Sequence, residues 1–139
     1  MRVEERLKEL GIELPQVVKP LAAYVPALKA GQWVYISGQT PMRQGKLSVT
    51  GKVGSDVTLE QAYEEAKQCA INCLAALKSV AGDLDNVAQI VKVTGFVASA
   101  EGFNDQPKVV NGASEFLGKV FGEQGAHARA AVGVAELPL

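Results

Sequence analysis

The spacing of apolar residues along the chain predicts three helices. Between Thr58 and Gly82 apolar residues recur every three or four positions, which is the period of a helix with one buried face. Thr58 and Gln61 match a capping box, in which both side chains satisfy amide groups at the helix start, and Gly82 is a typical stop. Similar stripes predict a helix over about 107–120 and a short one over 3–10.

The first two predicted strands form a pair. Residues 21–28 and 32–39 are rich in aromatic and β-branched residues and are separated only by a short Lys-Ala-Gly link. Pro26 cannot donate a hydrogen bond to a strand ladder, so the first strand is expected at a sheet edge or with a bulge near that residue.

Three further strands are expected. A short one is predicted at 47–50, and one at 89–99 with a bulge near Gly95, where the alternation changes phase. The last, at 127–137, alternates small apolar residues around Arg129. One face of it would carry Ala128, Ala130, Val132 and Val134, and the other Arg129, Ala131 and Gly133.

The order of these elements predicts an α+β fold in which two helices pack on one face of a single sheet. The 139 residues suit one domain, which we place at residues 21–139, after an N-terminal helix and extended arm at 1–20. The opposite face of the sheet would present mainly Ala, Val, Gly and Tyr, so we expect a partner subunit to cover it.

The composition of the chain argues against nucleic-acid binding and membrane insertion. Fourteen Lys and Arg against fifteen Asp and Glu give a formal net charge of −1 without a basic cluster, which makes nucleic acid an unlikely partner. No apolar run approaches the ~20 residues that span a membrane, and the first ten residues do not resemble a secretory signal. We therefore expect a cytoplasmic protein without a membrane partner.

The two cysteines, Cys69 and Cys73, lie one helical turn apart in the longest predicted helix. A metal site would need further ligands, and the single histidine, His127, is more than fifty residues away. We expect no metal site and two reduced, buried thiols that serve as small core residues.

Arg129 is the most informative single residue, because its permanent charge stands between alanines in a small, apolar strand. Its planar fork matches a carboxylate with two parallel hydrogen bonds, which favours an anionic ligand. A structural ion pair, with Glu136 or with an acid across an interface, is the alternative. The chain has no nucleophile elbow, phosphate-binding loop or dinucleotide fingerprint.

Three segments resemble the Rid/YjgF family, whose older labels are translation initiation inhibitor and endoribonuclease L-PSP. They are WVYISGQTP at 33–41, NDQPKVVNGASEFLGKVFGE at 104–123 and HARAAVGVAELP at 127–138. The resemblance implies a chorismate-mutase-like subunit that forms a homotrimer with clefts between subunits. It also implies hydrolysis of reactive 2-imino acids, such as 2-iminopropanoate and 2-iminobutanoate, to 2-keto acids and ammonia, without a cofactor.

The resemblance also implies roles for individual residues. Arg129 occupies the position of the family's carboxylate-binding arginine, Tyr24 that of its cleft tyrosine, Ser37 and Gly38 its cleft loop, and Asn111 its helix asparagine. Ala131 stands where the family's deaminases often have a cysteine. Tyr24, Ser37, Gly38 and Asn111 each have a structural alternative as an interface aromatic, a strand end or a capping amide.

A second departure keeps two functions open. Family members continue past the Leu-Pro motif into another strand, whose glutamate is implied to position the attacking water, and the 139 residues stop before it. Either the sequence is truncated or the activity lacks this acid, so the alternative is a non-catalytic, carboxylate-binding regulatory trimer. Ribonuclease activity is disfavoured by the sequence pI of about 5.8 and by the single histidine.

Overall fold

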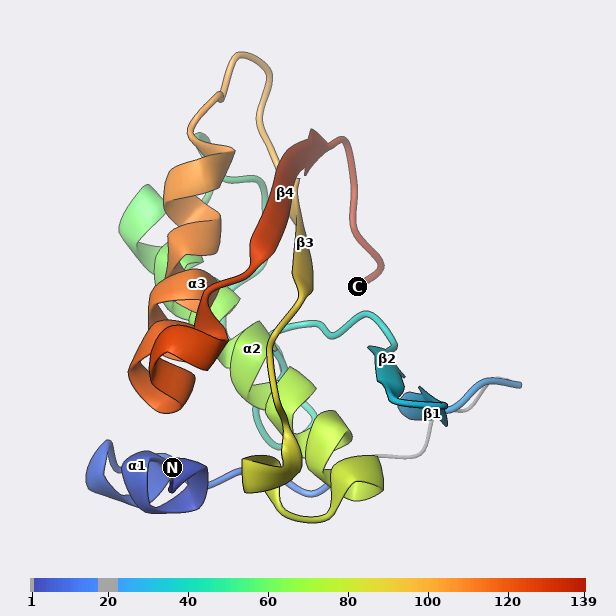
Figure 1. Cartoon of the computed structure of the whole chain (residues 1–139). Coiled ribbons are helices and arrows are strands. Elements are labelled where there is room, and N and C mark those ends of the chain that lie inside the picture. Colours follow the sequence, from blue (N-terminus) through green and yellow to red (C-terminus); the bar gives the residue numbers. More distant parts are fainter. Residues whose placement is uncertain (1, 18–22) are drawn as a thin grey trace.

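The computed structural model describes residues 2–17 and 23–139, which form an α+β fold (Figure 1). The elements in chain order are α1 (Val3–Glu9), β1 (Ala27–Ala30), β2 (Trp33–Ile36), α2 (Leu59–Ala81), β3 (Lys92–Ala98), α3 (Gln106–Phe121) and β4 (Ala128–Val134). Short 3-10 helices at Leu84–Asn86 and Gly122–Gly125 follow α2 and α3. The predicted α+β class is confirmed. No helix in the described residues is long and apolar enough to cross a membrane.

The three predicted helices are present. At the start of α2 the Gln61 amide donates to Thr58 Oγ1 at 3.1 Å and the Thr58 amide donates to Gln61 Oε1 at 2.9 Å, so the capping box is formed. The helix ends at Gly82, whose φ of 78° suits glycine. The apolar faces of α2 and α3 pack together in the main core around Leu74 and Phe121.

Helix α1 belongs to the same core. Val3 and Leu7 are buried in the cluster that contains Phe121. Lys78 on α2 forms an ion pair with Glu4, which ties α1 to the long helix. The predicted boundary between arm and domain, at residues 20 and 21, lies outside the described residues.

The strands form two separate sheets, so the prediction of a single sheet was wrong. Strands β1 and β2 pair antiparallel from Ala27↔Ile36 to Ala30↔Trp33, and β3 and β4 pair parallel from Lys92↔Ala128 to Ala98↔Val134. The β1–β2 hairpin rests on α2, whereas β3 and β4 rest on α3 (Figure 1). Each pair therefore gains its burial from a different helix, and no ladder between the described strands joins them.

The hairpin is shorter than the sequence predicted. The first strand begins at Ala27, directly after Pro26, and Tyr24 and Val25 precede it. The Ser37 amide donates to the Pro26 carbonyl at 2.9 Å, which continues the pairing by one bond. Residues 21 and 22 of the predicted strand lie outside the described residues.

Two smaller expectations were also wrong. Residues 47–50 form no strand, although isolated bridges join Arg43 to Lys46 before them and Val53 to Val57 and Ser99 after them. The predicted bulge near Gly95 is absent from the continuous β3–β4 register. Gly95 instead allows close packing, because a Cβ there would lie 2.5 Å from Cγ2 of Val110 on α3.

The face of each sheet away from the helices is apolar and exposed in the single chain. On β3 and β4 this face includes Phe96, which is 58% exposed, and its register partner Val132. On the hairpin it includes Leu28, Trp33 and Tyr35, each more than half exposed. This distribution agrees with the predicted uncovered sheet face.

Candidate functional site

Arg129 lies near the start of β4 and its side chain reaches toward α3. Its Nη1 donates to Asn111 Oδ1 at 2.8 Å and to Ser114 Oγ at 3.2 Å. A guanidinium carries five N–H groups, two of them on Nη1. The N–H groups of Nη2 and Nε therefore have no hydrogen-bond acceptor among residues 2–17 and 23–139.

The partners of Arg129 are neutral. None of the ion pairs among the described residues includes Arg129, so the pairing with Glu136 considered from the sequence is not formed within the chain. Arg129 is only partly exposed. A permanent positive charge in such a position is stabilised by an anion, which these contacts do not supply.

A second pair of residues extends this cluster. Ser114 Oγ lies 2.8 Å from His127 Nε2, and His127 Nδ1 lies 2.6 Å from the Gly125 carbonyl oxygen. The carbonyl only accepts, so Nδ1 carries the proton and Nε2 of the neutral ring accepts from the Ser114 hydroxyl. The hydrogen bonds then run in one direction, from Arg129 to Ser114, His127 and Gly125.

The sequence analysis did not select Ser114 or His127 for this site. The spacing along the sequence could have indicated both residues. Ser114 follows Asn111 by three positions on a helix and therefore shares its face. His127 precedes Arg129 by two positions at the start of an extended segment, and so points to the same side.

These residues line an open pocket of about 390 Å³. Its lining consists of Asn111, Ser114, Gly118, Gly122, Gly125, Ala126, His127 and Arg129. The volume lies at the lower end of the range for small-molecule sites, which suits a ligand of few atoms. Arg129 and His127 are the only side chains of this lining that carry or can take a charge.

The turn before β4 is held in place from two sides. Gln89 Nε2 donates to the carbonyls of Gln124 at 3.0 Å and Ala126 at 2.5 Å. Gly125 is buried, and a Cβ on it would lie 2.3 Å from the Leu117 carbonyl oxygen. Only glycine fits there, so the turn can lie close enough to α3 to present its carbonyl to His127.

The structure does not bring every predicted site residue to this pocket. Tyr24 is 58% exposed, Gly38 is exposed, and Ser37 Oγ donates to the Val25 carbonyl at 2.6 Å. These three residues lie at the base of the hairpin, and none of them lines the Arg129 pocket of the same chain. Ala131 is half-buried, packs against a second core cluster and is likewise absent from the lining.

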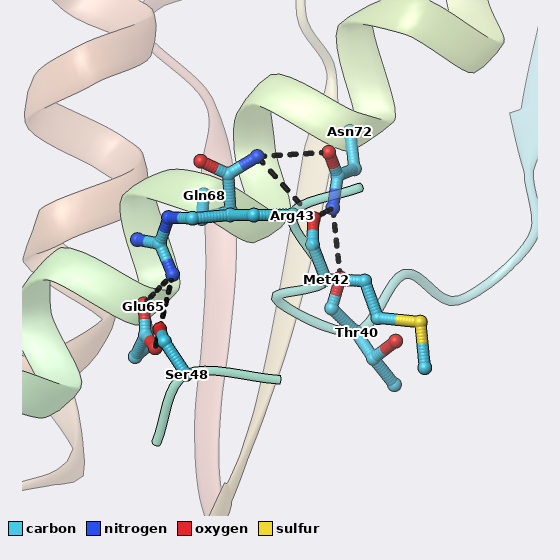
Figure 2. Close-up of polar contacts among 7 residues, drawn as sticks. All are labelled: Thr40, Met42, Arg43, Ser48, Glu65, Gln68 and Asn72. Atoms are coloured by element: carbon cyan, nitrogen blue, oxygen red, sulfur yellow. Dashed lines mark hydrogen bonds and ion pairs between the residues drawn. The ribbon is translucent and has the colours of Figure 1, made fainter. Parts of the chain in front are cut away.

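The loop after the hairpin is fastened to α2 (Figure 2). Asn72 Nδ2 donates to the carbonyls of Thr40 at 2.9 Å and Met42 at 3.0 Å. Arg43 Nη1 lies 2.6 Å from Glu65 Oε2. The Ser48 hydroxyl donates to the other oxygen of Glu65 at 2.9 Å. These contacts fix where the chain goes after Ser37 and Gly38.

The two cysteines are unbridged and half-buried on α2. Burial is the main cause that raises the pKa of the Cys69 thiol to about 12, and it raises that of Cys73 to about 11. Both thiols therefore stay protonated near neutral pH, which makes them poor nucleophiles and metal ligands. The described residues contain no group of three or more His, Cys, Asp or Glu side chains arranged to hold a metal ion.

The amino-acid sequence matches one protein family and is similar to several known proteins. Residues 4–139 match the family described as YjgF/chorismate mutase-like, putative endoribonuclease. Protein TCP17 of Trypanosoma cruzi is 40% identical over 138 residues, which are 99% of this chain and 86% of that protein. The 2-iminobutanoate/2-iminopropanoate deaminase of Dermatophagoides farinae is 32% identical over 128 residues, covering 91% of this chain and 84% of the deaminase.

A solved structure is also similar. A crystal structure of an Agrobacterium tumefaciens protein of unknown function has a TM-score of 0.88 and 48% sequence identity. The similarity covers 98% of this chain and 83% of the other.

Proposed function

The chain belongs to the YjgF/chorismate mutase-like family, and on that premise we propose that it hydrolyses small 2-imino acids to 2-keto acids and ammonia. Arg129 would hold the carboxylate of the substrate. The 32% identity with a protein named 2-iminobutanoate/2-iminopropanoate deaminase supports this reaction class.

The observation that carries the proposal is the set of neutral partners around Arg129. Asn111 and Ser114 occupy Nη1 and fix the plane of the guanidinium, while Nη2 and Nε have no acceptor among the described residues. Those two nitrogens together form an edge that binds a carboxylate with two parallel hydrogen bonds. A bound carboxylate would also supply the missing negative charge.

Imine hydrolysis requires only a small lowering of the activation barrier by the protein. The carbon of a protonated imine is electrophilic, and each ~1.4 kcal/mol of barrier removed accelerates hydrolysis tenfold. Holding the carboxylate on Arg129 fixes the imine carbon next to it, so that water attacks a positioned substrate. The fixed positive charge stabilises the anionic substrate without rearrangement of the protein. This hydrolysis needs no cofactor.

We further propose that the protein acts as a homotrimer with its pockets between subunits. The exposed apolar residues of the hairpin, such as Trp33 and Tyr35, are suited to burial in an interface. Tyr24, Ser37 and Gly38 would then come from the neighbouring subunit and complete the Arg129 pocket.

A carboxylate-binding protein without turnover is the second candidate. It is favoured by one observation, namely that no carboxyl group lines the pocket in the described residues to act as an acid or base. Cleavage of RNA, which the family description includes, fits the site less well. The net charge of −1 and a pocket with one Arg provide little to attract a polyanion.

The test combines turnover with binding. Decay of 2-iminopropanoate, generated in situ, is followed with the wild-type protein, with Arg129→Lys and with Arg2→Lys as a control on an exposed arginine. Calorimetric titration with 2-oxobutanoate measures carboxylate binding, which we expect at roughly millimolar strength because the ligand has few atoms.

Turnover by wild type and by Arg2→Lys but not by Arg129→Lys supports the proposal. Because Lys keeps the charge but loses the fork, this pattern would assign the role to the geometry of the guanidinium. Binding of 2-oxobutanoate without turnover in the wild type would favour the second candidate. Normal turnover by Arg129→Lys would contradict both.

A further inference from the structure

Hydrolysis of an imine requires proton transfers that Arg129 and Asn111 cannot perform. The attacking water must lose a proton, and the leaving nitrogen must gain one. A guanidinium stays protonated and an amide does not titrate, so neither exchanges protons near neutral pH. The acid or base of this site must therefore be another group.

His127 is the one side chain in the described pocket lining of the type that most often serves as a general base. The groups that face it are the Ser114 hydroxyl from α3, the Gly125 carbonyl from the turn and, through Ser114, the charge of Arg129. The Gly125 carbonyl fixes the tautomer, so the free lone pair of the neutral ring is on Nε2 and points at Ser114.

Ser114 is placed between the base and the anion-binding group. Its oxygen is 2.8 Å from His127 Nε2 and 3.2 Å from Arg129 Nη1. A hydroxyl both donates and accepts, so Ser114 can pass a proton in either direction. A base oriented by a third group and bonded to a hydroxyl is the arrangement that active sites use to move protons.

We propose that Ser114 and His127 are the proton-transfer pair of the Arg129 pocket, with Ser114 in contact with the reacting water and His127 acting through it as the base. This inference rests on the proposed imine hydrolysis and names the residues that move its protons.

In the first half of the reaction, the water oxygen bonds to the carbon of the protonated imine and the electron pair of the C=N π bond moves to nitrogen. One proton of the water passes to Ser114 as the proton of Ser114 passes to His127 Nε2. The products of this half are a neutral amino alcohol at the former imine carbon and an imidazolium.

In the second half, the proton on His127 returns through Ser114 to the amine nitrogen. The C–N bond breaks and its electron pair leaves with nitrogen, while the hydroxyl oxygen forms the keto C=O bond. The hydroxyl proton goes to the departing ammonia. The sum is one protonated imine and one water converted into one keto acid and one ammonium ion, with the pair restored.

The test uses three variants of the pair. His127→Gln keeps a hydrogen-bonding side chain but does not titrate, Ser114→Ala removes the hydroxyl and Ser114→Thr keeps it. Ser79→Ala on α2, whose hydroxyl bonds only to the Ala76 carbonyl, controls for loss of a helical serine. For each, kcat/KM for 2-iminopropanoate is measured from about pH 6 to pH 9, so that the shapes of the pH profiles can be compared. Titration with 2-oxobutanoate measures binding.

We expect kcat/KM to fall about 10²-fold in His127→Gln and Ser114→Ala, the usual size of a lost acid–base contribution, while 2-oxobutanoate still binds. Ser114→Thr, which keeps a hydroxyl, should lose less activity than Ser114→Ala, whereas the control Ser79→Ala should match the wild type. The pH profile of kcat/KM in His127→Gln should differ in shape from that of the wild type, because glutamine has no ionisable group to act as a base. A merely structural hydrogen bond would change the melting temperature but not the pH profile.

Failure of the inference and failure of the proposed function give different results. If the wild type turns over imine, Arg129→Lys does not, and His127→Gln matches the wild type at every pH, the proton-transfer pair is wrong and the hydrolase remains. If the wild type has no turnover, the hydrolase is wrong and the pair has no role in it.

Discussion

The α3–β3–β4 half of the molecule joins its candidate residues in one hydrogen-bond network, whereas the α2–β1–β2 half leaves its own candidates on an exposed hairpin. In the first half the bonds run from Arg129 through Ser114 to His127 and on to the Gly125 carbonyl. In the second half Tyr24 is mostly exposed, and the Ser37 hydroxyl bonds to the nearby Val25 carbonyl.

The difference follows from what each half packs against. Strand β4 and helix α3 are neighbours in the same chain, so residues on their facing sides meet without help from another subunit. The hairpin is covered by α2 on one face only, and its other face carries Trp33 and Tyr35. The first half is therefore preorganised in one chain, and the second is expected to gain its partners by assembly.

The largest expected effect is the recovery of turnover when two impaired variants are mixed. Arg129→Lys impairs the first half and Tyr24→Ala the second, and each alone should reduce turnover about 10²-fold through loss of an orienting contact. If the halves of one pocket come from different subunits, trimers co-refolded from equal amounts contain intact pockets. Random assembly gives roughly a quarter of the pockets both intact halves.

The experiment measures kcat of the co-refolded mixture and compares it with kcat of each variant alone. Light scattering should give three times the 14.7 kDa of one chain for all samples. Activity in the mixture no higher than the mean of the two variants would mean that both halves belong to one chain. A monomeric mass would remove the basis of the intersubunit pocket.

Gly125→Ala should displace the turn before β4 and destabilise the α3–β3–β4 half. The added Cβ would lie 2.3 Å from the Leu117 carbonyl oxygen, so the turn must move and carry its carbonyl away from His127. We expect a loss of about 3 kcal/mol in the free energy of unfolding, the upper range for overpacking against backbone.

The matched control is Gly118→Ala on the same rim of the pocket, where a Cβ would meet nothing within 4 Å. Alanine is the better helix former, so this variant should gain up to about 1 kcal/mol. Urea unfolding of both variants should therefore give shifts of opposite sign, and equal shifts would contradict the close packing of the turn.

Local patterns in the sequence were sufficient for the helices. The Thr58–Gln61 capping box and Gly82 mark α2 because the amides and carbonyls that they satisfy lie within a few residues. The single sheet was not predictable in this way, since the choice of strand partner depends on which helix each pair covers. The expected bulge at Gly95 failed similarly, because Val110, fifteen residues away, explains the glycine.

The candidate site was predictable in part. The contrast between Arg129 and its small neighbours, with the family resemblance, indicated Arg129 and Asn111, which the structure joins by a hydrogen bond. Ser114 and His127 were missed because each looks ordinary alone, and only the packing of α3 on β4 gives them a shared role. Tyr24 and Ser37 stay predictions, since the contacts proposed for them involve another subunit.

The smallest expected effect concerns the loop that leaves the hairpin. Asn72→Ala removes three hydrogen bonds: two that Asn72 Nδ2 donates to the carbonyls of Thr40 and Met42, and one that Asn72 Oδ1 accepts from Gln68 Nε2 (Figure 2). Neutral hydrogen bonds contribute ~0.5–1.5 kcal/mol each, and the Gln68 amide can turn to water, so unfolding should become easier by about 2 kcal/mol. Gln68→Ala should cost less, because Gln68 Nε2 makes one long bond to the loop, 3.5 Å to the Met42 carbonyl, besides its 3.0 Å bond to Asn72 Oδ1. Amide hydrogen exchange should become faster around residues 37–42, where these bonds hold the chain, and stay unchanged around His127, which belongs to the other half. A change around His127 in Asn72→Ala, with none around 37–42, would mean that these bonds do not hold the loop and that their loss acts on the other half through the core shared by α2 and α3.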